Sequence, residues 1–377
     1  MDAEPQHEVI RSRKRPLSKE DFCRVKGPDL NVEYIQRKGF MKPLLVEEDV
    51  EGTGLKVDAQ LNIDAIVNTL GSPLLLLLLL FSLLNVSLSS SPFSLLPSPF
   101  SLLFFFFQGG EFIVDVIDVQ TQEAGSMTLG DFSAYWKTPQ PRARTLNIIS
   151  LPVSSTHLGK LITPPNLVTS IDWVEMLASC CFDPEAKVDK YVLMSSKDSF
   201  TDFYVDFGGS SVWLFIAKGH KTFYLIPPTD ENLRQYEEWR DENSDEPAFW
   251  GDLVDICYEL HLDEGQVLLI PGGWIHAVFT PVDTISISDN FLHSFNISLQ
   301  LGIQKSEKRR REKDWFRFPC SDKLNSVAGD HHLRQLVGLS AFLPFSPPSS
   351  FLFRRPCRNS ADFLLLLLFV YFLASCS

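Results

Sequence analysis

The sequence contains no Cys-x-x-Cys pair, and its seven cysteines are scattered along 377 residues. A Cys-rich zinc finger and a disulfide-stapled secreted fold are therefore disfavoured, and a reducing compartment fits better. Acidic residues (47) outnumber basic ones (34), which gives a formal net charge of −13. This balance argues against a surface coated with phosphate-binding charge. No apolar run of the kind found in signal peptides occurs near the N-terminus.

The chain divides into six expected segments, which differ in composition. A polar leader with the basic run Arg11-Ser-Arg-Lys-Arg-Pro16 comes first, and is interpreted either as a solvated segment or as a nuclear-import or nucleic-acid contact. The expected segments are the leader at 1–30, the N-terminal part of the globular region at 31–72, a low-complexity insert at 73–108, the main domain at 109–303 with a barrel core at about 165–300, a basic helical extension at 304–337 and an apolar tail at 338–377.

Residues 72–107 contain only Leu, Phe, Ser, Pro, Val and Asn. Their first apolar run, 74–84, is shorter than the roughly 20 residues of a membrane-spanning helix, and prolines interrupt the rest of the block. A membrane protein is thus disfavoured. We interpret the block as foreign to the fold, either a translated intron or a gene-model error. The tail receives the same interpretation, with a C-terminal membrane anchor as the alternative.

The remaining sequence predicts a mainly β fold with flanking helices. Helices are expected at 32–36, 62–70, 128–136 (with Thr128 as N-cap), 171–178 and 307–314, and early strands at 42–46, 112–119 and 146–151. Short strands separated by Gly, Pro and Asp are then expected at 191–194, 201–207, 212–216, 221–226, 259–262, 267–270, 277–280, 284–288 and 295–299. Many short strands with turn chemistry between them favour a barrel or jelly roll.

Three features of the β-rich half suggest a metal site. If residues 201–207 form one strand, Tyr204 and Asp206 project to the same face. The turn Pro271-Gly-Gly-Trp delivers His276 to the start of a strand, and Lys221 opens another. A carboxylate, an imidazole and a third ligand meet the needs of a mononuclear Fe(II) oxygenase, and a lysine can neutralise a cosubstrate carboxylate. Taken singly, these residues are equally consistent with a surface Asp, a satisfied polar His and an edge-strand Lys.

Residues 191–213 resemble the metal-binding segment of JmjC-domain histone lysine demethylases. The branch that pairs this domain with a PHD finger, and its F-box/CXXC sister branch, are the most similar. Further matching segments lie at 115–119, 127–132, 146–151, 223–229, 270–283 and 290–297. The similarity runs from about residue 11 to 319 and skips the Leu/Phe-rich block, which supports the interpretation of that block as foreign.

The resemblance implies a double-stranded β-helix (jelly-roll, cupin-like) that uses Fe(II), 2-oxoglutarate and O2. It implies hydroxylation of an N-methyl group on a histone lysine and release of formaldehyde. The family's metal ligands fall on Tyr204, Asp206 and His276. Its cosubstrate contacts fall on Thr201, Lys221, Asn147 and Asn290. Strict alternation places Thr201 on the face opposite Tyr204, so its role requires a bulge or twist.

The chain departs from the family pattern at the site. Tyr204 stands where the family has His, and a phenol with a pKa of about 10 must lose a proton to bind a metal well, whereas imidazole binds neutral. Leu214 replaces a Tyr that touches the cosubstrate, and Ser288 with Asp289 replaces a Gly-Gly pair. Two alternatives to a demethylase therefore stay open: a catalytically impaired chromatin-binding scaffold, and a JmjC protein hydroxylase acting on unmethylated side chains.

The expected partner is a histone tail carrying a methylated lysine, and the expected role is regulation of chromatin and transcription in the nucleus. The basic run at 308–311 is interpreted as a solvated helix face or as a contact with nucleosomal DNA. No Cys/His zinc set precedes Arg11, so no PHD reader is expected in this chain.

Overall fold

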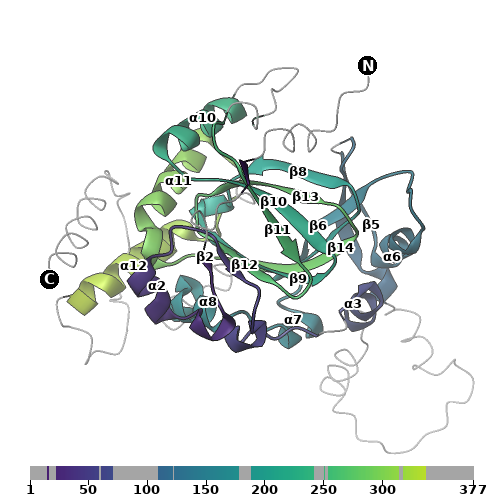
Figure 1. Ribbon diagram of the computed structural model, residues 1–377, viewed down its shortest axis with the longest axis horizontal. Coiled ribbons are helices and arrows are strands. Elements are labelled where there is room, and N and C mark those ends of the chain that lie inside the picture. The colour runs from purple at the N-terminus through teal and green to yellow at the C-terminus, as the bar shows by residue number, and fades with distance from the viewer. Residues whose placement is uncertain are drawn as a thin grey trace, which may run out of the picture.

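The computed structural model describes residues 15–16, 23–58, 61–70, 109–121, 123–177, 188–241, 250, 254–313 and 317–336 (Figure 1). Its strands are β1 (Arg15–Pro16), β2 (Cys23–Arg24), β3 (Leu44–Val46), β4 (Ile113–Asp118), β5 (Glu123–Thr128), β6 (Leu146–Pro152), β7 (Tyr191–Ser195), β8 (Ser199–Tyr204), β9 (Ser211–Lys218), β10 (His220–Ile226), β11 (Tyr258–Asp263), β12 (Val267–Ile270), β13 (Ile275–Thr280) and β14 (Thr284–Phe291). Its α-helices are α2 (Val32–Lys38), α3 (Ile63–Leu70), α6 (Leu129–Lys137), α7 (His157–Leu161), α8 (Asn166–Ile171), α9 (Trp173–Leu177), α10 (Asp230–Asp241), α11 (Ile297–Arg310) and α12 (Ser321–Leu336).

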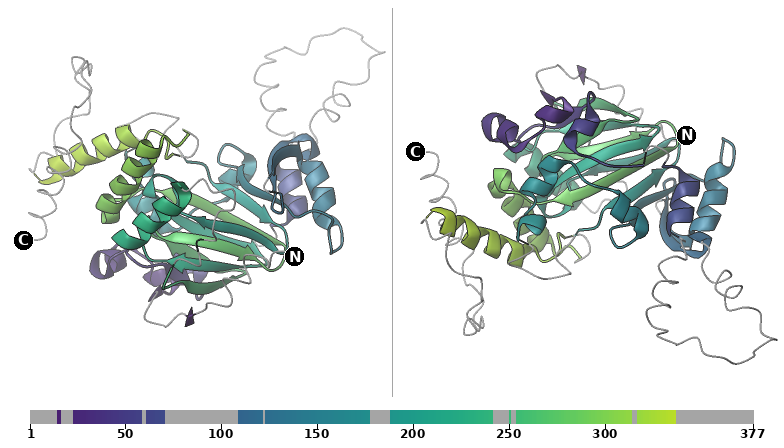
Figure 2. Two further views of the ribbon diagram at one scale, coloured as in Figure 1. Left: turned by 90° about the horizontal axis from the view of Figure 1, so that it is seen from above. Right: turned by 90° about the horizontal axis from the view of Figure 1, so that it is seen from below.

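The strands form two sheets that face each other. One has the order β1-β11-β10-β13-β8, and the other the order β2-β3-β12-β9-β14-β7-β6-β4-β5. In Figure 1, α2, α8, α7 and α3 lie along one side of the barrel, and α10 and α11 lie on the opposite side. Figure 2 shows α11 and α12, in yellow-green, at one end of the barrel, and α3 and α6 at the other. The expected jelly-roll class, mainly β with flanking helices, is confirmed.

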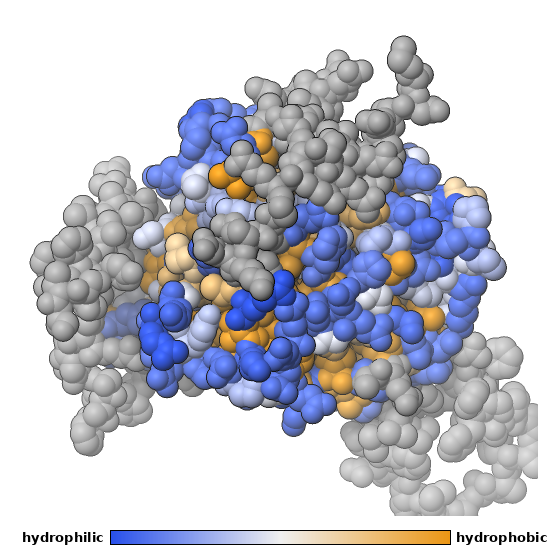
Figure 3. All heavy atoms as spheres, viewed as in Figure 1, coloured by the Kyte–Doolittle hydropathy of each residue, from blue (hydrophilic) through white to orange (hydrophobic). Residues whose placement is uncertain are grey.

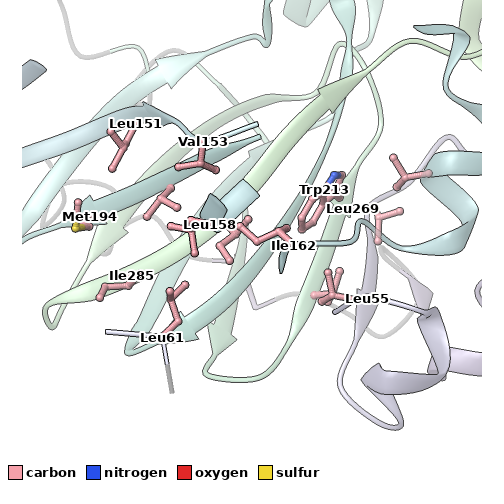
Figure 4. Close-up of a cluster of buried hydrophobic side chains, with 14 of the residues drawn as sticks. Leu55, Leu61, Leu151, Val153, Leu158, Ile162, Met194, Trp213, Leu269 and Ile285 are labelled. Carbon is pink, nitrogen blue, oxygen red and sulfur yellow. The ribbon is translucent and has the colours of Figure 1, made fainter. Parts of the chain in front are cut away.

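Two apolar clusters define which side of the larger sheet faces the barrel interior. Leu214 of β9, Leu268 of β12 and Phe223 of β10 belong to a cluster that draws on both sheets, so it fills the space between them. Trp213 and Leu269 belong to a different cluster that includes helix residues, so they point out of the barrel (Figure 4). Alternation along each strand then tells which residues line the interior.

The exposed large hydrophobic side chains of the described residues are scattered. On the face shown in Figure 3, hydrophilic residues predominate at the edges and hydrophobic ones show between them over the barrel. Met41 lies between α2 and β3, Ile113 on β4 and Ile149 on β6, so these exposed residues come from separate parts of the chain. Scattered residues of this kind are ordinary on a folded domain. No helix in the described part of the chain is long and apolar enough to cross a membrane.

Most predicted elements are present, with bounds that shift by a few residues. The expected N-cap is confirmed, because the Thr128 hydroxyl accepts from the Asp131 amide at 3.0 Å at the start of α6. The strands expected at 191–194, 212–216, 221–226, 259–262, 267–270 and 277–280 correspond to β7, β9, β10, β11, β12 and β13. Strand β5 and helices α10 and α12 were not expected from the sequence.

Two predictions of secondary structure are wrong. Residues 295–299 are not a strand, since they fall in the short 3-10 turn Ser294–Asn296 and the first turn of α11. The apolar residues of this segment alternate, which suggests a strand. Further along the chain, however, Gln300, Gln304 and Glu307 are buried at helical spacing, so the segment is the start of a helix. The helix expected at 307–314 therefore begins ten residues earlier, and it ends at Arg310 before Arg311, whose φ is 57°.

The strand expected at 201–207 ends at Tyr204, so Asp206 lies beyond it. Asp206 precedes a 3-10 turn, Phe207–Gly209, in which Gly208 and Gly209 have φ of 66° and 63°. Residues with side chains rarely adopt such φ values, and a strand cannot continue through them. The glycine pair thus bends the chain directly after the candidate ligand.

The Leu/Phe-rich insert and the apolar tail lie outside the described residues, but the flanks of the insert are informative. Helix α3, which ends at Leu70, contacts the short 3-10 turn Gly109–Glu111 and also α6. The chain thus leaves and re-enters the described part of the fold at neighbouring elements.

Deleting residues 72–108 is expected to leave the domain folded, because the two ends of the deletion already lie beside each other. Thermal unfolding followed by circular dichroism should show a cooperative transition within about 3 °C of that of the full chain, the size of a change of roughly 1 kcal/mol or less. Loss of the cooperative transition would mean that the segment belongs to the core.

Candidate functional site

The pairing of β8 with β13 contains a bulge that places Thr201. Tyr204 pairs with His276 and Thr201 pairs with Val278, so three steps on β8 match two on β13. Val278 belongs to the apolar cluster inside the barrel. Thr201 and Tyr204 consequently share the interior face, which strict alternation would forbid. The bulge that the role of Thr201 requires is therefore present.

Phe203, one of the two residues between them, points the other way. Phe203 packs against Trp250, with ring centroids 5.3 Å apart, in the cluster beneath α10. Phe203 therefore packs on the outer face of β8, and the interior face carries the polar side chains of Thr201 and Tyr204.

His276 lies inside the barrel with only 1% of its surface exposed. Its Nδ1 is 3.0 Å from the carbonyl oxygen of Trp274. Because a carbonyl only accepts hydrogen bonds, Nδ1 carries the proton, and Nε2 of the neutral ring has a free lone pair. That Nε2 is 3.9 Å from Oδ2 of Asp206. A single ion with bonds of about 2.1 Å could contact both atoms.

Asp206 is held in place by its neighbours. Burial raises the pKa of its carboxyl group, while His276 and a hydrogen bond from Asn290 lower it. Asn290 also donates from Nδ2 to Ser210 Oγ at 3.1 Å, which orients its amide. Asn290 therefore supports Asp206 from strand β14 of the opposite sheet.

Helix α11 fixes the turn after Asp206. The Gly208 amide donates to Glu307 Oε1 at 2.6 Å, and the Gly208 carbonyl accepts from Gln304 Nε2 at 3.0 Å. A Cβ atom at Gly208 would lie 2.6 Å from the Cβ of Phe318. The turn is thus clamped on its backbone and has no room for a side chain.

Tyr204 occupies the third position of the candidate metal site. Its ring centroid is 4.2 Å from that of His276, and the planes are inclined by 54°. Burial, and then the charge of Asp206, raise the pKa of its phenol above the ordinary value. The phenol is therefore protonated at neutral pH and is a poor ligand for a divalent ion.

Of the three candidate ligands, Asp206 and His276 suit Fe(II) and Tyr204 does not. Asp206 and His276 have the donor atoms, separation and tautomer that a metal site needs. Among the residues that the structure describes, no group of three His, Cys, Asp or Glu side chains could hold an ion. The family resemblance expects a His at the position of Tyr204, and a His there would supply a third donor of this kind.

Lys221 lies on β10 with its side chain inside the barrel, on the same face as Phe223. It is 4% exposed, and its Nζ donates to Ser195 Oγ of β7 at 3.0 Å. Burial lowers the pKa of this amine to about 8. A buried cation whose partner is a neutral hydroxyl is suited to receive an anionic group from a ligand.

The binding of a dicarboxylate is expected to weaken above pH 8, because Lys221 loses its charge there. The charged fraction falls about tenfold per pH unit above the pKa, so affinity should decline between pH about 8 and 10 and be constant between about 6 and 7. Calorimetric titration of 2-oxoglutarate at several pH values measures this. Constant affinity up to pH 10 would contradict a charged Lys221 as the anion receptor.

Asn147 is joined to the Lys221 side of the barrel. Its Oδ1 accepts from the Ser196 amide at 2.8 Å, and Ser196 is the neighbour of Ser195 in the chain.

Thr201 lies on the interior face of β8, but its side chain is exposed. The structure thus brings Tyr204, Asp206, His276 and Asn290 together, with Lys221 and Asn147 linked to each other through two consecutive serines.

The sequence reasoning missed two serines that line the same interior. Ser195 is the partner of Lys221, and Ser286 is fully buried on β14. The run Thr284-Ile-Ser-Ile-Ser-Asp-Asn290 contains the signal, since its polar residues alternate with isoleucine.

Comparison with known proteins identifies similar chains. Residues 191–291 match the family described as JmjC domain, hydroxylase. The chain is 37% identical over 332 residues to histone lysine demethylase PHF8 of Danio rerio, which covers 88% of this chain and 28% of that protein. It is 36% identical over 311 residues to lysine-specific demethylase 7A of Homo sapiens, covering 82% and 29%. It is 37% identical over 309 residues to lysine-specific demethylase 2A of Xenopus tropicalis, covering 78% and 24%. The chain thus spans less than a third of the length of these relatives.

Proposed function

We propose that this chain, which belongs to the JmjC-domain histone lysine demethylase family, is an Fe(II)- and 2-oxoglutarate-dependent dioxygenase that demethylates lysine in histone tails. The observation that carries the proposal is the placement of Asp206, His276 and Lys221 inside one barrel, with the His276 lone pair turned toward Asp206. These are the residues that a two-part site for a metal and a dicarboxylate needs.

Each residue has a separate task in this proposal. Asp206 and His276 would hold the iron, which would supply the activation of O2. Lys221 and Ser195 receive the distal carboxylate of 2-oxoglutarate, and Asn290 keeps Asp206 in its orientation. The Trp274 carbonyl keeps the proton of His276 on Nδ1 and leaves Nε2 free.

The reaction is tested with the purified protein and histone peptides that carry mono-, di- or trimethylated lysine. Formaldehyde and succinate are expected in equal amounts, and His276→Ala is expected to release neither. A peptide that gains one oxygen without losing a methyl group would indicate a protein hydroxylase instead. No turnover with any methylated peptide would overturn the demethylase proposal.

A second candidate function is a chromatin-binding scaffold that keeps the fold without turnover. The observation that favours it is the protonated, buried phenol of Tyr204 at the third ligand position. This candidate predicts that methylated histone peptides bind equally well with and without Fe(II). A metal requirement for peptide binding would count against it.

The proposed partner is a histone tail with a methylated lysine, which implies a nuclear protein that regulates chromatin. The alternative contact with nucleosomal DNA through residues 308–311 has less support. Lys308 pairs with Asp322, Arg309 with Glu237 and Arg310 with Glu312, so three of these four cations are paired within the chain.

A further inference from the structure

The strand β14 presents a row of polar side chains to the barrel interior. Ile285 and Ile287 belong to the cluster between the larger sheet and its helices. Because side chains alternate along a strand, Ser286 and Asn290 point the other way, toward the smaller sheet. At one end of the row, β14 lies beside Ser195, the hydrogen-bond partner of Lys221. At the other end, Asn290 hydrogen-bonds Asp206.

Ser286 is the unusual member of the row. It is completely buried, and its Oγ has no hydrogen-bond partner within the described part of the chain. Its cross-strand neighbours on the same face are Leu193 of β7 and Ile216 of β9, which offer no polar side chain. A buried hydroxyl without a partner costs free energy, so such a group often marks the place of a ligand atom or an ordered water.

The register places this hydroxyl next to the buried cation. Ser195 pairs with Thr284 and Leu193 pairs with Ser286, so Ser195 and Ser286 are diagonal neighbours on one face. Diagonal neighbours lie within about 7–8 Å of each other. Lys221 Nζ is 3.0 Å from Ser195 Oγ. Two hydroxyls and an ammonium group, from β7, β14 and β10, therefore lie in one region of the barrel interior.

The chemistry of these three groups selects a carboxylate. An ammonium and two hydroxyls can donate together to the two oxygens of one carboxylate group. In the described residues, Lys221 forms no ion pair with an acidic side chain, so the chain leaves this cation for a ligand. Such an anion would also satisfy the orphaned Ser286 hydroxyl.

We propose that Ser286, together with Lys221 and Ser195, binds the distal carboxylate of 2-oxoglutarate. This inference rests on the proposed function and adds to it a binding residue at a position that the family resemblance does not assign. Ser286 acts as a donor to the cosubstrate and not as a support for the fold.

The test is calorimetric titration of 2-oxoglutarate into the full chain under anaerobic conditions with Fe(II). Ser286→Ala is expected to weaken binding roughly 10- to 100-fold, the usual loss for one hydrogen bond to a charged group. Thermal unfolding of the ligand-free variant should be unchanged or shifted to higher temperature, because an unsatisfied hydroxyl has been removed. Ser133→Ala, at a buried serine on α6, is the matched control and should bind like the natural chain.

The outcomes separate this inference from the proposed function. Binding by the natural chain with no loss in Ser286→Ala overturns the inference and leaves the dioxygenase proposal standing. No binding of 2-oxoglutarate by the natural chain overturns both. In combination with Lys221→Met, the two losses are expected to be less than additive, because both residues contact one carboxylate. Strict additivity would contradict a shared ligand group.

Discussion

Replacing Tyr204 by His is expected to increase the affinity for Fe(II) by roughly 1,000-fold at pH 7. A phenol with a pKa of about 10 must lose its proton to bind well, which costs about 4 kcal/mol at pH 7. Burial raises the pKa of Tyr204 further and makes this cost larger. An imidazole binds in its neutral form and avoids that cost. Competition with a fluorescent Fe(II) chelator measures the affinity.

Tyr204→Phe is the matched control for this prediction. It keeps the ring that packs on His276 and removes only the hydroxyl. If the phenol is no ligand, the Phe variant binds Fe(II) like the natural chain. A loss of affinity in the Phe variant, or no gain in the His variant, would show that Tyr204 already coordinates the metal.

Replacing Lys221 by Met is expected to reduce the affinity for 2-oxoglutarate by roughly 100-fold or more at pH 7. Removing one partner of a buried charge pair leaves the other charge unpaired, which costs about 2–5 kcal/mol. Calorimetric titration measures the loss. The ligand-free variant should unfold at the same or a higher temperature, because the methionine removes a buried amine whose pKa burial has already lowered.

Lys218→Met controls for the change in net charge. Lys218 ends the neighbouring strand β9 and its side chain is exposed, so its loss should leave affinity unchanged. Equal losses in the two variants would mean that the effect comes from long-range charge and not from a buried contact.

The strands and the principal site residues could be predicted because they depend on local patterns. Short β-rich runs bounded by Gly, Pro and Asp identify β9, β10 and β12 without knowledge of their partners. The family resemblance then assigned Asp206, His276 and Lys221 to one site. The structure places these side chains in the barrel because each lies on the interior side of its strand or in the turn directly after it.

The features that could not be predicted depend on contacts between distant parts of the chain. The bulge that turns Thr201 toward the interior exists only through the register of β8 with β13. The start of α11 at Ile297 depends on the burial of Gln300 and Gln304, and Gln304 hydrogen-bonds the turn after Asp206. A single-strand pattern contains none of this information.

The most direct test of the Fe(II) and 2-oxoglutarate site is an anaerobic titration of both into the natural chain, with Tyr204→His measured beside it. The readout is the visible charge-transfer band that forms only when the metal and the oxo acid bind one site. We expect the band in both proteins, with the natural chain requiring a much higher Fe(II) concentration. No band in the natural chain at saturating Fe(II) would contradict the dioxygenase proposal and would leave a histone-binding module.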